Sequence, residues 1–242
     1  MKKLLFITPE LPYPPQSGVK VKSLKLLHAL AEKYQVTLAC PLKMEDAQYV
    51  DEFYAISPCV HHLHQEVSIQ RTPGTLITSY LRGIPLNVHR TYNEQLQNNI
   101  AALANQQDVV FLDHYEVYPY LPTDYTGLRV YHAHNAYFKM WARYAQLPGN
   151  PVMRLAAYIE SRRVKKYEAQ VANNTDLCFS APNDAQELAK AGVTPDKLHD
   201  TFHLGDDQQL DLPDLQYANT ENKLMYVGFW AGNPIPKDCY GS

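Results

Sequence analysis

The sequence predicts a doubly wound α/β domain built on a Rossmann-like parallel sheet, and two observations lead to this fold class. Short apolar runs, typical of strands buried on both faces of a parallel sheet, recur along the chain. Segments with apolar residues at helical spacing lie between these runs, and such alternation is typical of open α/β sheets. A chain of 242 residues with 45% hydrophobic residues can also bury a core of the required size.

The first predicted unit is a strand, a loop, a helix and a second strand. Residues 3–8 form a continuous apolar run that ends in a proline-rich loop. Ser17 is suited to cap the next helix, whose apolar face carries Leu24, Leu27, Leu30 and Ala31. Residues 36–40 predict the next strand, so this unit is one βαβ crossover.

Three further strands and two longer helices continue the alternation. We predict the strands at residues 109–112, 128–132 and 177–181 and the helices at 91–106 and 151–173. Residues 41–90 indicate no definite element. Their histidines lack other metal-ligand residues at a suitable spacing beyond Glu66, so a solvated polar loop is expected at His61, His62 and His64.

The composition near the end of the chain predicts the domain organisation. Residues 200–221 hold six carboxylates and no Lys or Arg. We therefore expect one domain at residues 1–205 and an acidic connector at 206–222. A strand at 223–228 has no helix after it to complete a βα unit. Residues 223–242 are expected to be the interrupted start of a second domain or an irregular tail.

Charge, cysteines and motifs argue against several classes of protein. A net charge of −3 disfavours a nucleic-acid partner. The four cysteines have no zinc-ligand spacing, which favours a reducing, cytoplasmic location and no bound metal. The apolar run at the start of the chain is expected to be a strand rather than a signal peptide, and no stretch is apolar enough to span a membrane. The Walker A, G-x-G-x-x-G and G-x-S-x-G motifs are absent.

Residues that directly follow the predicted strands are candidate site residues, because ligands of open α/β sheets bind at the carboxyl ends of the strands. In the first such loop, Ser17, Gly18 and Lys20 lie where a helix begins. Free backbone N–H groups and a positive charge at this point suit an anion. A proline-rich turn with a helix cap is the alternative interpretation of this loop.

Polar residues also follow the third and fourth predicted strands. Asp113 and His114 come after the third strand and are placed to bind sugar hydroxyls or a phosphate, with a helix cap as the alternative role of Asp113. His134 and Asn135 come after the fourth strand, and strand periodicity places His132 and His134 on the same side. A histidine there can bind a hydroxyl, although a structural role is the common alternative.

The long helix predicted from residue 151 carries a basic cluster. Five basic residues and two glutamates give it a local net charge of +3. The basic residues are Arg154, Arg162, Arg163, Lys165 and Lys166. They are suited to contact anionic lipid at the inner face of a membrane or an anionic lipid-linked acceptor. A solvated helix face is the alternative.

Several of these segments resemble the N-terminal half of the family 4 (group 1) glycosyltransferases, which have the two-domain GT-B fold. Residues 6–18 and the helix after them are similar to the first strand, glycine loop and first helix of that family. His134 and Asn135 resemble the His-Asn pair that ends a central strand in many members. Residues 141–145 and 177–185 are similar to the bacterial exopolysaccharide branch, and the likeness extends over nearly the whole chain.

The resemblance implies transfer of a sugar, with retention at the anomeric carbon, from a nucleotide diphosphate sugar to a surface-polysaccharide or lipid-linked acceptor. It implies neither a metal nor another cofactor, since the nucleotide sugar is a substrate. His134 is then the catalytic residue in contact with the transferred sugar. The implied substrate-binding residues are Ser17, Gly18, Lys20, Asp113, His114 and Asn135.

Two departures from the family pattern matter. Tyr137 stands where many members have a Glu. The donor site of the family, with its E-x7-E pair, belongs to a C-terminal domain that would follow residue 228. Glu160 and Glu168 have the E-x7-E spacing but lie before the predicted connector, so we interpret this match as coincidence. The chain is therefore expected to be half an enzyme without turnover of its own. A nucleotide-sugar 2-epimerase-like isomerase and a noncatalytic sugar-binding module are the alternatives.

Overall fold

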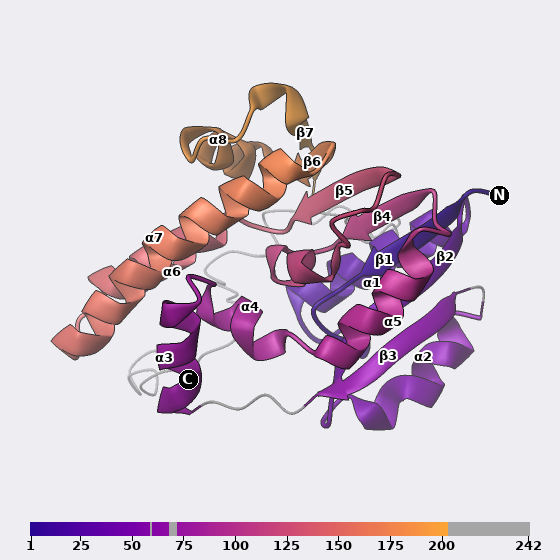
Figure 1. Ribbon diagram of the computed structural model, residues 1–242, viewed down its shortest axis with the longest axis horizontal. Coiled ribbons are helices and arrows are strands. Elements are labelled where there is room, and N and C mark those ends of the chain that lie inside the picture. Colours follow the sequence, from indigo (N-terminus) through magenta and orange to yellow (C-terminus); the bar gives the residue numbers. More distant parts are fainter. Residues whose placement is uncertain (59, 68–71, 203–242) are drawn as a thin grey trace, which may run out of the picture. The chain divides into compact units, whose positions relative to one another are not determined.

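Seven parallel strands form one sheet in the order β3-β2-β1-β4-β5-β6-β7, with helices on both of its faces (Figure 1). This computed structural model describes residues 1–58, 60–67 and 72–202. The strand order changes direction between β1 and β4, as it does in doubly wound sheets. The predicted α/β fold class is confirmed.

The first crossover agrees with its prediction. β1 (Lys3–Ile7) leads through α1 (Gly18–Ala31) to β2 (Gln35–Lys43), which pairs parallel with β1. The Ser17 side chain accepts a hydrogen bond from the backbone N–H of Lys20 and so caps α1. This bond satisfies one of the N–H groups that a helix leaves unpaired at its first turn.

The segment at residues 41–90 contains an edge strand and short helices that the sequence did not indicate. They are η1 (Ala47–Tyr49), α2 (Val50–Ile56), β3 (His61–Val67), α3 (Pro73–Leu81) and α4 (Leu86–Thr91). The solvated loop expected at the three histidines is therefore wrong, since they lie in β3. Within the described chain β3 pairs only with β2, and an edge strand can carry polar side chains instead of a continuous apolar run.

The middle of the chain supplies the centre of the sheet. α5 (Glu94–Ala104) precedes β4 (Val109–Leu112), and the 3₁₀-helix η2 (Tyr115–Tyr120) lies between β4 and β5 (Leu128–Ala133). The predicted helix and both predicted strands of this part are confirmed. β4 pairs with β1 and β5, so these three strands are neighbours.

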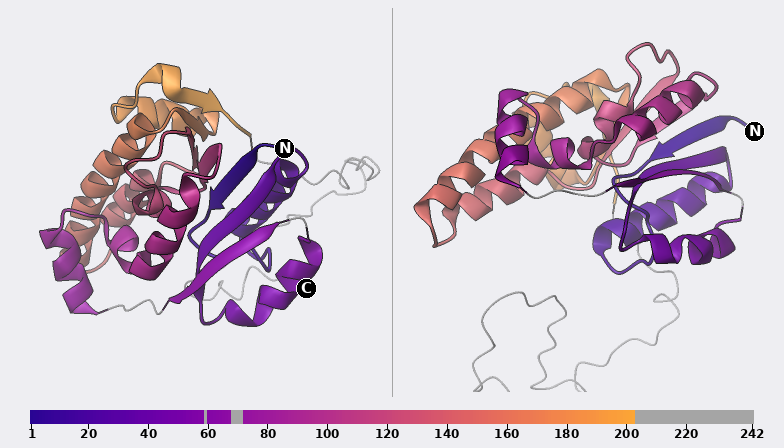
Figure 2. Two further views of the ribbon diagram at one scale, coloured as in Figure 1. Left: turned by 45° about the vertical axis from the view of Figure 1, so that its right-hand side comes forward. Right: turned by 60° about the horizontal axis from the view of Figure 1, so that its bottom comes forward.

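Two long antiparallel helices follow β5 and extend away from the sheet (Figure 2). They are α6 (Tyr137–Gln146) and α7 (Pro151–Asn174). β6 (Leu177–Ser180), α8 (Pro182–Lys190), η3 (Pro195–Lys197) and β7 (Leu198–Asp200) complete the sheet. Among the described helices, none combines the length and the hydropathy needed to cross a bilayer.

Alternate residues of β1 divide the hydrophobic core between the two faces of the sheet. Leu4 and Phe6 belong to a cluster that includes apolar residues of α1 and α2. Leu5 and Ile7 belong to a second cluster that includes apolar residues of α4, α5, α7 and α8. Because successive side chains of a strand point to opposite faces, one apolar run contributes to both cores. The connector predicted at residues 206–222 and the segment predicted at 223–242 lie outside the described residues.

Candidate functional site

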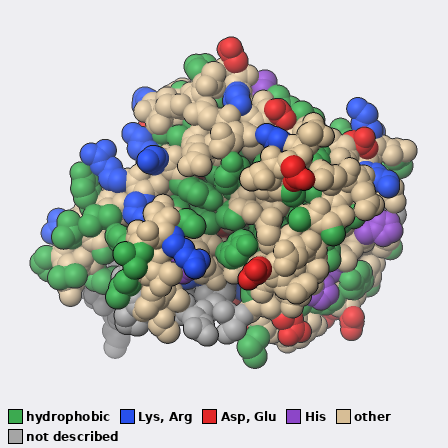
Figure 3. Space-filling view, viewed as in Figure 1, with side chains coloured by type: hydrophobic (Ala, Val, Ile, Leu, Met, Phe, Trp, Pro, Cys, Tyr) green, Lys and Arg blue, Asp and Glu red, His purple; other side chains and the backbone are tan. Residues whose placement is uncertain are grey.

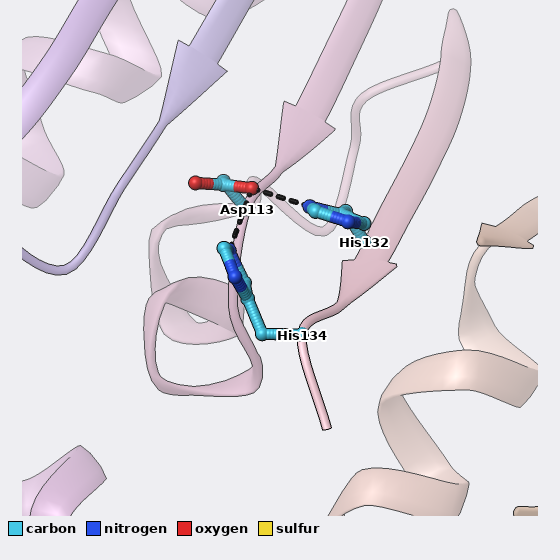
Figure 4. Close-up of side chains that lie close together, drawn as sticks. All are labelled: Asp113, His132 and His134. Carbon is cyan, nitrogen blue, oxygen red and sulfur yellow. Dashed lines mark hydrogen bonds and ion pairs between the residues drawn. The ribbon is translucent and has the colours of Figure 1, made fainter. Parts of the chain in front are cut away.

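Three buried polar side chains meet at the carboxyl ends of β4 and β5. Asp113 is the first residue after β4, and its backbone N–H donates to the carbonyl of Ile7 in β1. One oxygen of its carboxylate lies 2.6 Å from Nδ1 of His132 and 3.0 Å from Nε2 of His134 (Figure 4). The hydroxyl of Ser23 in α1 donates to the other oxygen. We call these four residues the Asp113 cluster.

Strand pairing explains why the cluster forms. Leu112 of β4 lies opposite Tyr131 of β5, so the next residues, Asp113 and His132, are also adjacent. His134 is two positions further on and therefore on the same side as His132. Both imidazoles reach the same carboxylate oxygen, in agreement with the periodicity of the sequence.

The electrostatics of the cluster depend on the Asp113 carboxylate. Burial raises the pKa of Asp113, but the charge of His134 and the hydrogen bonds from both imidazoles outweigh burial and hold the pKa well below its usual range. A carboxylate only accepts hydrogen bonds, so Nδ1 of His132 and Nε2 of His134 are assigned as the protonated nitrogens. Burial also lowers the pKa of His132. Asp113 therefore fixes the tautomer and orientation of both rings.

A buried cation lies close to this carboxylate. The ammonium of Lys22 has no hydrogen-bond partner among the described residues, and its side chain, with His132, lines a mainly apolar cavity of about 250 Å³. Burial lowers the pKa of Lys22, and the charge of Asp113 opposes that shift. Asp113, His132 and His134 are residue types that can ligate a divalent ion. The nearby ammonium and the three hydrogen bonds from Ser23, His132 and His134 already compensate the carboxylate, which favours a hydrogen-bonding role over metal binding.

A polar cavity of about 260 Å³ lies beside the Asp113 cluster, and we call it the Glu116 cavity. Its lining comes from the carboxyl ends of β1, β2 and β4 together with α1, α4 and α6. The residues are Pro9, Glu10, Val19, Lys43, Asn87, Arg90, Thr91, His114, Glu116 and Tyr137. The ring of His114 connects cavity and cluster, since its centroid lies 4.5 Å from that of Tyr137 and 6.1 Å from that of His134.

Burial changes the acidity of two titratable residues of this cavity, His114 just before η2 and Glu116 within it. Burial raises the pKa of Glu116 to about 7, although a hydrogen bond with Asn87 opposes the shift. Burial, followed by the charge of His134, lowers the pKa of His114 to about 3. At neutral pH Glu116 is therefore divided between its acid and carboxylate forms, whereas His114 is neutral. A carboxyl with such a pKa can accept a proton from a bound hydroxyl.

The structure separates the other predicted site residues from the cluster. Lys20 lies 2.8 Å from the carboxylate of Asp46 and, with Ser17, lines a neighbouring cavity of about 430 Å³. Gly18 faces open space and has no positive φ, so its backbone does not require glycine. Asn135 is exposed at the end of β5. Of the predicted residues, Asp113 and His134 are brought into direct contact, and His114 lies beside them.

Sequence reasoning missed most of the residues of the Glu116 cavity. Glu10, Lys43 and Glu116 lie at or just after the ends of β1, β2 and β4. All three are charged residues near the carboxyl end of a strand. Their position in the sequence is therefore the same kind of signal that indicates Asp113. Asn87 and Arg90 come from α4, in a segment where the sequence indicated no element, so no local signal could have found them.

The two glutamates with E-x7-E spacing have structural contacts. Both oxygens of Glu168 accept backbone N–H groups of the first turn of α6, from Tyr137 and Phe138. Glu160 accepts the backbone N–H of Leu86 and forms an ion pair with Arg163. Burial raises the pKa of Glu168 to about 8. These contacts agree with the interpretation of the spacing as coincidence.

Comparison with solved structures places the fold. Neither the protein-family models nor the curated proteins give a match to this sequence. The structure of Arabidopsis thaliana UGT89C1 in complex with UDP is similar to this chain, with 12% sequence identity and a TM-score of 0.51. The similarity covers 98% of this chain and 62% of the UGT89C1 chain. The chain has the fold of one GT-B half. A putative UDP-N-acetylglucosamine 2-epimerase from Listeria monocytogenes is similar with 13% identity and a TM-score of 0.46. That similarity covers 82% of this chain and 44% of the epimerase chain.

The chain spans less than two thirds of the length of either of these two structures. In this GT-B half, the strand order changes direction between β1 and β4. Ligands of open α/β sheets bind in the crevice at such a switch point, outside the carboxyl ends of the strands. Asp113 follows β4, and Glu10 lies beyond the end of β1, so the Asp113 cluster and the Glu116 cavity both lie at the switch point.

Proposed function

We propose that this chain is the acceptor-side half of a retaining glycosyltransferase of the family 4 type. The reaction transfers a sugar from a nucleotide diphosphate sugar to a surface-polysaccharide or lipid-linked acceptor. The observation that carries the proposal is the Asp113 cluster beside a polar cavity at the switch point of a GT-B half. The His-Asn pair at residues 134 and 135 supports it, because it follows the strand next to β4.

The residues of the Glu116 cavity suit a sugar acceptor. Glu10, Glu116 and Asn87 supply hydrogen-bond acceptors for hydroxyl groups, and Tyr137 supplies a ring edge or face. We assign Glu116 to hold the acceptor hydroxyl by a hydrogen bond, because its carboxyl lines the cavity and, with a pKa of about 7, can accept or donate one at neutral pH. The function of the cavity is thus to orient one hydroxyl of the acceptor.

His134 is the proposed contact to the transferred sugar, and Asp113 is its positioning residue. Asp113 holds Nε2 of His134 in its protonated form, so the ring has one orientation relative to the cavity. Ser17, Gly18 and Lys20 at the start of α1 are proposed to lie beside the donor phosphates, which suit a helix N-terminus. His114 and Asn135 are proposed to complete the acceptor contacts. Most of the rate would come from positioning and from stabilising the charge of the departing diphosphate.

The test compares two histidines that share burial and a bond to Asp113. We expect His134→Ala to lower transfer by about 10-fold or more in a protein that carries this chain together with a donor half. His132→Ala is the matched control, because His132 lies within β5 and bonds the same carboxylate oxygen. The assay measures glycosylated product from a panel of nucleotide diphosphate sugars with alkyl glycosides as acceptors.

Three results would contradict the proposal. Equal losses for the two histidine variants would assign His134 to structure alone. Release of an epimerised sugar in the absence of any acceptor would indicate an isomerase. Efficient transfer by the 242-residue chain alone would show that this half does not need a donor half. Thermal unfolding of each variant separates loss of function from loss of fold.

A further inference from the structure

The tip of the α6–α7 hairpin exposes an unusual number of large apolar side chains. We define the hairpin tip as residues 143–159, which include the last turn of α6, the connecting loop and the first turns of α7. Val152, Met153 and Leu155 are 71%, 67% and 60% exposed. Tyr144, Leu147, Tyr158 and Ile159 are exposed as well. A group of large, exposed apolar side chains in one short segment indicates an interaction site.

The charge of the same surface has one sign. The sequence contains no Asp or Glu from residue 137 to residue 159. Glu160, the next acidic residue, is buried against Arg163. The exposed cations beside the apolar residues are Arg143, Arg154, Arg162 and Lys166. Figure 3 shows Lys and Arg side chains next to hydrophobic ones on the part of the surface where the hairpin lies.

A groove of about 700 Å³ runs between α6 and α7 and combines both features. Phe138, Leu155 and Tyr158 contribute apolar walls, and Arg154, Arg162 and Lys165 also line it. The guanidinium of Arg162 lies over the ring of Tyr158, with 5.5 Å between its central carbon and the ring centroid. A groove with apolar walls and cations suits a ligand that has a hydrocarbon part and an anionic part.

The base of the hairpin holds the tip in place. The hydroxyl of Ser161 donates to the carbonyl of Phe138 at 3.0 Å, and Glu168 accepts both backbone N–H groups described above. Arg163 donates to the carbonyl oxygens of Ser79 and Ile84, which joins α7 to the α3–α4 segment. The exposed apolar residues therefore lie on a fixed helical scaffold and do not belong to a loose loop.

We propose that the hairpin tip is a docking surface for an anionic phospholipid bilayer. Val152, Met153 and Leu155 enter the interface between headgroups and acyl chains, and the cations contact lipid phosphates. Tyr144 and Tyr158 have the amphipathic rings that are enriched at this depth. We choose a bilayer over a protein partner because the exposed charges beside the apolar residues, on Arg143, Arg154, Arg162 and Lys166, are all positive, which suits a surface of anionic headgroups. The contact is peripheral and does not depend on the proposed sugar transfer.

Vesicle binding by the 242-residue chain tests the proposal. We expect the chain to sediment with vesicles of phosphatidylglycerol and phosphatidylcholine and to remain in solution with vesicles of phosphatidylcholine alone. Binding is expected to fall as salt is raised, because ions screen the contribution of the basic residues. Loss of turnover in the His134→Ala variant would leave this binding unchanged, so the two proposals fail independently.

Two sets of substitutions distinguish the charged and apolar contributions. Arg154→Gln with Arg162→Gln should lower the partition coefficient about 25-fold, since each cation near an anionic bilayer contributes a factor of about 5. Val152→Ser, Met153→Ser and Leu155→Ser together should lower it at least about 10-fold through loss of buried apolar area. The matched control is Lys2→Gln with Lys33→Gln, which removes two exposed charges outside the hairpin and should change binding little.

The proposal fails if the charged control weakens binding as much as the hairpin variants do. It also fails if the unmodified chain ignores anionic vesicles or binds neutral ones equally well. Sedimentation velocity without vesicles gives one more outcome: a dimer that the triple serine variant abolishes would assign the apolar surface to a second copy of the chain. All substituted side chains of the triple variant are well exposed, so the variant is expected to fold.

Discussion

The carboxyl edge of the sheet and the hairpin tip depart from the usual distribution of side chains in opposite directions. At the carboxyl edge, Asp113, His132 and His134 are polar and almost fully buried. At the hairpin tip, Val152 and Met153 are apolar and largely exposed. Globular proteins bury ionisable groups rarely and seldom group large apolar side chains on the surface. Both departures oppose stability or solubility, which is why we assign a function to each region.

The two regions differ in how much of the fold depends on them. Hydrogen bonds from β5, from the residue that follows β5 and from α1 converge on the Asp113 carboxylate, so a change there leaves several buried groups without partners. The side chains of the hairpin tip have lost little water on folding. Substitutions at the carboxyl edge should therefore affect stability strongly, and substitutions at the tip should affect stability much less.

The largest expected effect is the loss of the Asp113 carboxylate. Asp113→Ala should lower the free energy of unfolding by about 3–5 kcal/mol, because it leaves two imidazoles and the Ser23 hydroxyl without their common acceptor. Urea unfolding measures the change. Glu187→Gln is the control, since it removes surface ion pairs with Lys139 and Lys190, and such pairs contribute little to stability. Similar losses in the two variants would show that the buried donors of the cluster do not depend on the Asp113 carboxylate as the geometry indicates.

The intermediate effect is a dependence of stability on pH at the Glu116 cavity. The pKa of Glu116 in the folded chain, about 7, lies above its ordinary value, so between these pH values the folded state binds the extra proton. The contribution of Glu116 to stability should therefore decrease as pH rises from about 5 to 7, by at most about 1.4 kcal/mol per pH unit, while His114, whose pKa is lowered to about 3, contributes an increase over the lower part of this range. Glu168, with a pKa of about 8, extends the decrease to higher pH.

Glu116→Gln sharpens this prediction. In this variant, the free energy of unfolding should no longer show the decrease below about pH 7 that is due to Glu116, and it should keep the decrease at higher pH that is due to Glu168. Urea unfolding at several pH values measures both parts. Glu94→Gln changes an exposed carboxyl of α5 and serves as the control. A pH profile that is the same in all three proteins would show that Glu116 titrates as an ordinary surface carboxyl.

The smallest expected effect belongs to the hairpin tip. The triple variant Val152→Ser, Met153→Ser and Leu155→Ser should change the free energy of unfolding by only about 0.5 kcal/mol per residue, because these side chains are exposed in the folded chain. Thermal and urea unfolding measure it. A loss as large as that of Asp113→Ala would show that the tip packs against something within the chain, and the contrast between the two regions would disappear.

Local sequence features predicted much of the fold and part of the site. The apolar runs of β1, β4 and β5 and the cap of α1 by Ser17 depend on neighbouring residues, so they were found from the sequence. Asp113 and His134 were selected because each follows a buried strand. β3 was missed, because an edge strand needs no continuous apolar run.

By itself, the sequence determined the alternation of strands and helices, the position of polar residues at strand ends and the basic character of α7. Tertiary structure decided which of these residues meet. Sheet order brings Asp113 next to His132, and the Glu116 cavity combines residues that follow β1 with residues of β2, α4 and η2 that are far apart in the chain. It also decided that the start of α7 presents apolar side chains outward. Periodicity reports only contacts between near neighbours in sequence, whereas pairing and packing create contacts and exposure that no short segment encodes.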